Sequence, residues 1–371
     1  MRIFYAAGSR PNEALAESSV WRRNLLNALA SMGHDIVELD YDLEPHYRHA
    51  DPTSAGAGAF IAAQRHLLEA ALLEQVTRAH RQKPLDVFFS YFYSAFARPE
   101  VIRRITEMGI VTVNWYCNAS YQFDLVSEIA PAYSFCLVPE RFRLDDYREA
   151  GARPIYCQEA ANPDFYRPSE RTDEYDVVFV GACYGARPAY VRYLLDHDID
   201  VHVFGPGWTK LTPPRVPARI RRSLGQVRRR VAGRQLRPQL LPARACGGVL
   251  TDEDMVRMYS RARISLGFSV VGETHAGTSP IRQVRLRDFE APMSGAFYAL
   301  EYMPEIEAFF VPGKEIVCFS SKRELTEVVR HFLAHPDEAE RVRQAGHQRA
   351  LRDHTWQRRF GDAFREMGLD S

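Results

Sequence analysis

The sequence lacks several features that would place a chain in a special class of protein. No run approaches the ~18 consecutive apolar residues that a membrane-spanning helix needs. The six cysteines are far apart and form no C-x-x-C pair, which argues against a zinc or disulfide framework and favours the reducing cytoplasm. Neither sign of charge dominates, because 48 Lys and Arg residues accompany 47 Asp and Glu residues. No overall field therefore favours a nucleic acid or a membrane as partner.

The length and the order of the apolar segments indicate two α/β domains. The chain has 371 residues, which exceeds the size at which one hydrophobic core stops growing. Short β-branched or aromatic runs alternate with amphipathic stretches, as in parallel sheets that are buried on both faces. Strands are expected at residues 2–7, 35–39, 85–92, 110–116, 134–138 and 154–158, and again at 175–182, 199–204, 264–268, 296–300 and 316–319.

A linker without periodicity, residues 161–174, separates the two arrays. The expected domains are residues 1–165 and 170–352, and a C-terminal helix within 353–371 is expected to pack back on the first domain. Two doubly wound, Rossmann-like domains of this kind would face a central cleft, with ligands at the carboxyl ends of the strands. No G-x-G-x-x-G follows either first strand, which disfavours a nicotinamide dehydrogenase.

The first candidate binding motif is a strand, turn and helix at residues 179–188, which contains Gly181 and Arg187. A helix N-terminus presents backbone N–H groups and the positive end of a dipole, which suits a diphosphate. Arg187 would add a charge-assisted hydrogen bond. The alternative is a turn that needs glycine for its conformation only.

The second motif is a helix expected over residues 282–293, after a glycine-rich loop at 272–278. Arg282 and Arg285 are three residues apart and would share one helix face, and Arg287 follows two positions later. Three guanidinium groups could hold a diphosphate through forked hydrogen bonds, and Glu290 could accept both hydroxyls of a ribose. The alternative is a solvated basic face in which Asp288 and Glu290 are ion partners.

Taken together, residues 175–360 resemble the C-terminal domain of CgeB-type (spore maturation protein) bacterial glycosyltransferases, a branch of the glycosyl transferases group 1 superfamily. The resemblance rests on segments in the same order as in the family, and these span about half of the chain. The segments are residues 175–181, 203–208, 250–266, 285–295, 310–317, 335–338 and 352–360.

The resemblance implies the α/β GT-B fold and a nucleoside-diphosphate-sugar donor, with UDP, GDP and ADP all open. It implies that Glu290 grips the donor ribose, that Arg285 and Arg287 contact the diphosphate, and that the backbone at Gly248 holds the base. By analogy, the reaction is a retaining hexosyl transfer in polysaccharide or glycoconjugate biosynthesis. The sequence departs from the superfamily at Arg282, because the residue eight positions before Glu290 is usually acidic.

Few residues are candidates for the catalytic acid or base. His275 lies in the loop before the arginine-rich helix, and Asp124 follows a polar loop in which Asn118 stands where relatives often carry aspartate. His46 and His49 fall in a predicted polar loop, residues 41–58. For each of them a surface or structural role is the alternative. No metal is expected, because arginine can neutralise a diphosphate.

Residues 209–251 form a basic insert with ten arginines, one lysine and no acidic residue. Such an insert could bind an anionic acceptor or a membrane surface, whereas its lack of interleaved aromatic residues disfavours nucleic acid. A solvated loop is the alternative. Three function classes follow: a transferase with a small-molecule, glycan or protein acceptor, a nucleotide-sugar epimerase or hydrolase on the same fold, and a non-catalytic binding protein that uses the insert.

Overall fold

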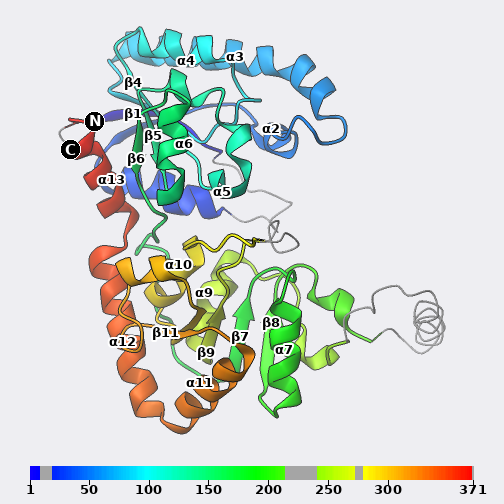
Figure 1. Ribbon diagram of the computed structural model, residues 1–371. Helices are drawn as coiled ribbons and strands as arrows, with labels where there is room; N and C mark the ends of the chain where they lie inside the picture. Colours follow the sequence, from blue (N-terminus) through cyan, green and yellow to red (C-terminus); the bar gives the residue numbers. More distant parts are fainter. Residues whose placement is uncertain (9–18, 214–239, 272–278, 370–371) are drawn as a thin grey trace, which may run out of the picture. The chain divides into compact units, whose positions relative to one another are not determined.

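The computed structural model describes residues 1–8, 19–213, 240–271 and 279–369, which form two compact units (Figure 1). Unit 1 consists of Met1–Phe165 and Asp353–Ser371, and unit 2 of Tyr166–Arg352. The candidate His275 lies outside the described residues, as do residues 214–239 of the basic insert.

The centre of unit 1 is a parallel sheet with the strand order β2-β1-β3-β4-β5-β6. Strands β1, β3, β4 and β5 are mostly buried, and every residue of β3 is buried, as the continuous apolar runs predict, whereas the edge strand β2 has no buried residue. The strands are β1 (Arg2–Ala6), β2 (Asp35–Glu38), β3 (Val87–Ser90), β4 (Val111–Trp115), β5 (Phe135–Val138) and β6 (Pro154–Tyr156).

The helices of unit 1 include one from the end of the chain. This helix, α13 (Trp356–Glu366), is capped by the Thr355 side chain, and Trp356 packs edge-on against Trp115 with ring centroids 5.2 Å apart. A π-helical turn (Arg22–Leu26) precedes α1. The other helices are α1 (Asn27–Ser31), α2 (Glu44–Arg48), α3 (Ala57–Gln82), α4 (Pro99–Thr106), α5 (Ala119–Gln122) and α6 (Leu144–Glu149).

Unit 2 contains a second parallel sheet with the order β11-β10-β9-β7-β8. Thr251 and Ser321 cap α9 and α11 through their side-chain oxygens, the hydrogen bond that such residues supply at helix starts. The strands are β7 (Tyr175–Val180), β8 (Val201–Phe204), β9 (Ala262–Gly267), β10 (Tyr298–Glu301) and β11 (Val317–Phe319). The helices are α7 (Arg187–Asp196), α9 (Asp252–Arg261), α10 (Leu286–Met293), α11 (Lys322–Ala334) and α12 (Pro336–Asp353).

The strand order of unit 2 reverses next to β7. The chain passes from β7 through α7 to β8 on one side, and the later strands β9, β10 and β11 lie on the other side. The connections after β7 and β9 therefore diverge at the carboxyl ends of these strands. In open α/β sheets such a switch point is where ligands bind.

The helix predicted over residues 282–293 begins only at Leu286. Arg282 instead lies in an extended segment that forms an antiparallel bridge with Val270, just after β9. Asp288 then accepts a hydrogen bond from the Arg285 backbone N–H at 2.9 Å and so fixes the start of α10. Arg282 and Arg285 therefore do not share a helix face, because backbone pairing with the segment after β9 takes precedence over helix formation.

Two further findings apply to the described part of the chain. None of its helices is long and apolar enough to cross a membrane. It also contains no group of three or more His, Cys, Asp or Glu residues that could hold a metal ion. All six cysteines are free thiols.

Candidate functional site

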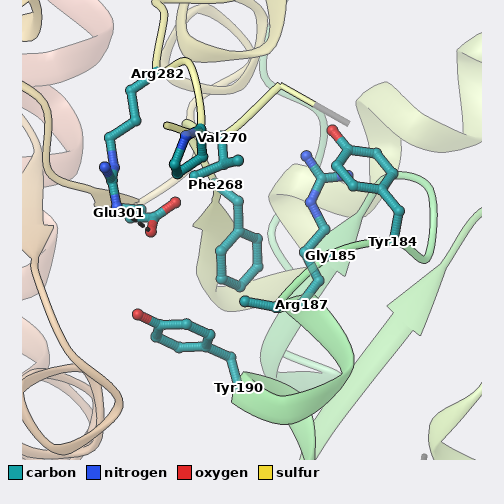
Figure 2. A pocket seen from close by; sticks show the side chains of 10 residues that line it. Tyr184, Gly185, Arg187, Tyr190, Phe268, Val270, Arg282 and Glu301 are labelled. Atoms are coloured by element: carbon teal, nitrogen blue, oxygen red, sulfur yellow. Dashed lines mark ion pairs between the residues drawn. The ribbon is translucent and has the colours of Figure 1, made fainter. Parts of the chain in front are cut away.

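A pocket of about 250 Å³ lies in unit 2 at the carboxyl ends of β7, β9 and β10 (Figure 2). Its lining comes from three places: residues 184–187 and 190 of the β7–α7 turn and α7, residues 268, 270, 280 and 282 around the bridge after β9, and residue 301 at the end of β10. The pocket thus coincides with the switch point of the sheet. Arg187 and Arg282, two of the predicted site residues, line it.

Arg187 is a buried cation at the start of α7, with only 7% of its surface exposed. Its guanidinium lies 3.7 Å from the centroid of the Tyr184 ring, and one amine donates to the Ala182 carbonyl at 2.9 Å. Burial lowers the pKa of Arg187 to about 10, so the group remains charged at neutral pH. Its buried Nε has no hydrogen-bond partner within the described ranges. An anion in the pocket would neutralise the charge of this guanidinium.

Arg285 lies directly behind the same wall of the pocket. Its Nη1 donates to the Tyr184 hydroxyl at 2.9 Å, and its Nη2 donates to the Val270 carbonyl at 2.7 Å. Tyr184 therefore holds two arginines, one through its ring and one through its hydroxyl. Because both guanidinium groups contact Tyr184, the positive charge of Arg285 also contributes to lowering the pKa of Arg187.

The opposite end of the pocket contains a carboxylate. Glu301 is buried, and its Oε2 accepts hydrogen bonds from the backbone N–H and the hydroxyl of Ser269 at 3.1 and 3.2 Å. Its Oε1 lies 3.7 Å from Nη2 of Arg282, whose side chain is 46% exposed. Figure 2 shows this pair across the pocket from Arg187 and Tyr184. Burial and the charge of Glu301 raise the pKa of Tyr190, which lines the same space.

A second cluster connects α9 and α10. Arg287 forms an ion pair with the buried Glu290 at 2.9 Å, donates to the Tyr259 hydroxyl at 3.2 Å and also contacts the sulfur of Met255. Burial alone would lower the pKa of Arg287, but Tyr259 and Glu290 raise it above its ordinary value. The predicted residues Arg287 and Glu290 thus contact each other, but they do not line the pocket.

Gly181 and Gly248 have different surroundings, and neither lines the pocket. The carbonyl of Gly181 accepts from the Trp208 indole at 2.8 Å, and a Cβ on Gly205 would lie 2.5 Å from the same oxygen. Gly181 therefore stands where two turns approach closely. Gly248 precedes α9, and a Cβ there would meet nothing within 4 Å, so its backbone borders open space.

The candidates in the first half of the sequence belong to unit 1. Asp124 is exposed on a 3₁₀ turn, Phe123–Leu125. The predicted polar loop 41–58 instead contains α2 and the start of α3, and His46 is buried there against the ring of Phe96, with 4% exposed. His49 stacks on Phe60 with a centroid distance of 4.3 Å. Aromatic packing therefore accounts for the positions of both histidines.

Of the residues that line the pocket, only Arg187 and Arg282 were predicted as site residues, and those missed include Tyr184, Tyr190, Phe268 and Glu301. A signal existed for Glu301, because a carboxylate directly after a predicted buried strand lies at the ligand-binding edge of the sheet. Tyr190 is three positions after Arg187 and therefore shares its helix face. No comparable signal distinguishes Tyr184 or Phe268 from ordinary core aromatics.

Comparison with known proteins extends these observations. Residues 187–365, slightly less than half of the chain, match the family model described as glycosyl transferase-like. Sucrose-phosphate synthase from Thermosynechococcus elongatus is similar in structure, with a TM-score of 0.59 and 13% identity over 99% of this chain and 98% of that one. The chain has the GT-B fold. No curated protein sequence is significantly similar to it.

Two other GT-B neighbours illustrate the range of activities on the fold. Anabaena Alr3699/HepE, solved in complex with UDP and glucose, has a TM-score of 0.57 and 12% identity over 98% of this chain and 99% of that one. A proposed UDP-N-acetylglucosamine 2-epimerase from Listeria monocytogenes has a TM-score of 0.51 and 10% identity over 100% and 97%. At such identities the likeness establishes the fold and leaves the reaction to the residues of the site.

Proposed function

We propose that the chain is a glycosyltransferase of the CgeB type that uses a nucleoside-diphosphate-sugar, and that the pocket of unit 2 receives the diphosphate-sugar end of this donor. The observation that carries the proposal is the pair of arginines held by Tyr184 at the switch point. Arg187 is buried, charged and lacks an acceptor at Nε, and Arg285 adds a second fixed cation. A diphosphate supplies both the charge and the oxygen acceptors that these groups require.

The same arrangement suits the chemistry of sugar transfer. When the bond between the anomeric carbon and the diphosphate oxygen breaks, the bonding electrons stay on the leaving diphosphate, and the acceptor oxygen bonds to the sugar and loses its proton. Donors fixed before the reaction stabilise this developing charge at no reorganisation cost. In this proposal Arg187 and Arg285 take the role that a metal ion has in other transferases. We propose, by analogy with the superfamily, that the transfer retains the configuration at the anomeric carbon.

The Arg287–Glu290 cluster supports a place for the nucleoside. Glu290 is buried beside Arg287, and the open backbone at Gly248 precedes the neighbouring helix α9. We assign the ribose hydroxyls to Glu290 and the base to the backbone at Gly248. The acceptor is assigned to unit 1. The candidate acid or base residues are Asp124 of unit 1 and His275, which lies outside the described residues. The six free cysteines support the cytoplasm as compartment.

Calorimetric titration with UDP, GDP and ADP tests the proposal. We expect one of the three to bind. Glu290→Gln should lower the affinity for that nucleotide, because the variant loses the negative charge that is proposed to bind the ribose. Glu327→Gln is the matched control, since Glu327 is an exposed residue of α11 that pairs with Arg323 and does not line the pocket. A folded chain that ignores all three nucleotides would contradict the proposal and favour a binding protein that uses the basic insert.

The epimerase neighbour gives one alternative a specific basis. An epimerase or hydrolase on the same fold would release nucleotide from the sugar conjugate without any acceptor. Incubation of the chain with the conjugate alone, followed by chromatography of the products, distinguishes the two. Intact donor in the absence of an acceptor is the expected result for a transferase, and complete cleavage would favour the alternative.

A further inference from the structure

Among the described residues, the carboxylate end of the pocket has an unused capacity for hydrogen bonds. Arg282 and Glu301 are 3.7 Å apart, which is an ion-pair distance but beyond the range of a good hydrogen bond. Oε2 of Glu301 is fixed by two donors of Ser269, so Oε1 is the oxygen on the side of Arg282. The pair thus presents a held acceptor beside a half-exposed donor.

Aromatic rings border the same end of the pocket. Tyr190 and Phe268 both line it, and their ring centroids are 5.4 Å apart in an edge-to-face arrangement. Rings beside a few placed polar groups are typical of small-molecule sites. At about 250 Å³ the pocket is smaller than the roughly 300–1,000 Å³ that whole drug-sized ligands occupy, so it suits one part of a nucleotide-sugar.

The charges divide the pocket into two ends. Arg187 and Arg285 meet at Tyr184, where the diphosphate is proposed to bind, whereas the charges of Arg282 and Glu301 cancel. A sugar that carries its own carboxylate would approach the buried negative charge of Glu301. The far end of the pocket therefore disfavours an acidic sugar and suits hydroxyl groups, which both donate and accept.

We infer that Arg282 and Glu301 together bind two adjacent hydroxyls of a neutral donor sugar, with Glu301 accepting from one hydroxyl and Arg282 donating to the other. This inference rests on the proposed function. Glu301, at the end of β10, thereby supplies the carboxylate that the sequence lacks at position 282. Both residues are specificity-determining rather than catalytic, since they contact the sugar away from the cations that hold the leaving group.

The test separates the contribution of the sugar from that of the nucleotide. UDP, GDP and ADP and their glucose conjugates are titrated into the parent, Glu301→Gln, Arg282→Gln and the control Glu327→Gln. The measured quantity is the ratio of the dissociation constants of each nucleotide and its conjugate. We expect either pocket variant to reduce this ratio about tenfold, the size of one hydrogen bond to a charged group, while nucleotide affinity stays within about twofold.

Three results would overturn the inference, and they differ from failure of the proposed function. The first is an unchanged ratio in folded Glu301→Gln, or in Arg282→Gln should the former not fold. The second is a parent that binds a nucleotide but gains nothing from attached glucose. The third is a parent that binds the glucuronate conjugate of its preferred nucleotide as tightly as the glucose conjugate. If the parent binds none of the nucleotides, the proposed function itself fails.

Discussion

Tyr184 offers the sharpest test of the arginine arrangement, because it holds two cations by two different parts of one side chain. The ring lies 3.7 Å from the Arg187 guanidinium, and the hydroxyl accepts from Arg285 at 2.9 Å. Tyr184→Phe removes the second contact and keeps the first. Tyr184→Leu removes both. The two variants therefore separate the contributions of the hydroxyl and the ring to diphosphate binding.

The magnitudes follow from the two contacts. A hydrogen bond to a charged group contributes about 1.5 kcal/mol at the low end of its range, so Tyr184→Phe should weaken nucleoside diphosphate binding about tenfold. A partly desolvated cation–π contact contributes about 1 kcal/mol more. Tyr184→Leu should therefore lose about 2.5 kcal/mol, or somewhat less than 100-fold in affinity. Without Tyr184, the repulsion between Arg187 and Arg285 could also move the two guanidinium groups apart.

The assay is calorimetric titration with the nucleoside diphosphate that the parent binds and with the matching nucleoside, which has no phosphate. We expect both variants to lose affinity for the diphosphate only. Tyr193→Phe is the control, because Tyr193 is on α7, the helix that follows Tyr184, stacks on His197 and does not line the pocket. Equal losses for nucleoside and diphosphate, or none for either variant, would refute the reasoning.

Three further predictions concern stability. Burial raises the pKa of Asp288 to about 6. The protonated carboxyl therefore contributes fully to the free energy of unfolding below about pH 4, and this contribution is lost as the pH rises through 6. Urea unfolding should show that the parent loses up to about 3 kcal/mol of stability relative to Asp288→Asn over that range. Gly205→Ala should lower the melting temperature of unit 2 far more than Gly313→Ala. The angle φ is positive at both positions, but only at residue 205 would a Cβ lie 2.5 Å from a backbone oxygen. Equal decreases in melting temperature for the two variants, measured by calorimetry, would contradict this packing. Trp356→Ala should cost about 3–5 kcal/mol in unit 1, where Trp356 is fully buried, and a loss below 1 kcal/mol in denaturant titration would contradict that role.

Much of the architecture could be predicted because it depends on local patterns. Each predicted strand has a counterpart among the strands of the two sheets, since continuous apolar runs between helices leave little choice in a parallel sheet. The starts of α9 and α11 also depend on local signals, because Thr251 and Ser321 cap them through their side chains. The helix near residue 282 was wrong in its start, since backbone pairing between Val270 and Arg282 is a non-local effect.

The candidate site could be predicted only in part, and the reason is again the distance along the chain. Arg187 belongs to a local strand, turn and helix, so its place at the switch point follows from sequence order. The grouping of Tyr184 with Arg285 joins residues about a hundred positions apart, and no spacing rule connects them. Periodicity likewise placed Arg282 and Arg285 on one helix face, with Arg287 two positions later, whereas the structure divides the three among the pocket, its outer wall and the α9–α10 cluster.

The change of residue type at position 282 becomes intelligible only with Glu301. If 282 were acidic, as is usual in the superfamily, its carboxylate would stand within ion-pair range of the buried Glu301, and two such like charges raise each other's pKa. Arginine removes this conflict and leaves one carboxylate in the pocket, held by Ser269. The two positions are therefore physically coupled, and relatives with an acid at 282 should carry an uncharged residue at 301. The chemistry of the sugar end then depends on the pair rather than on either residue alone.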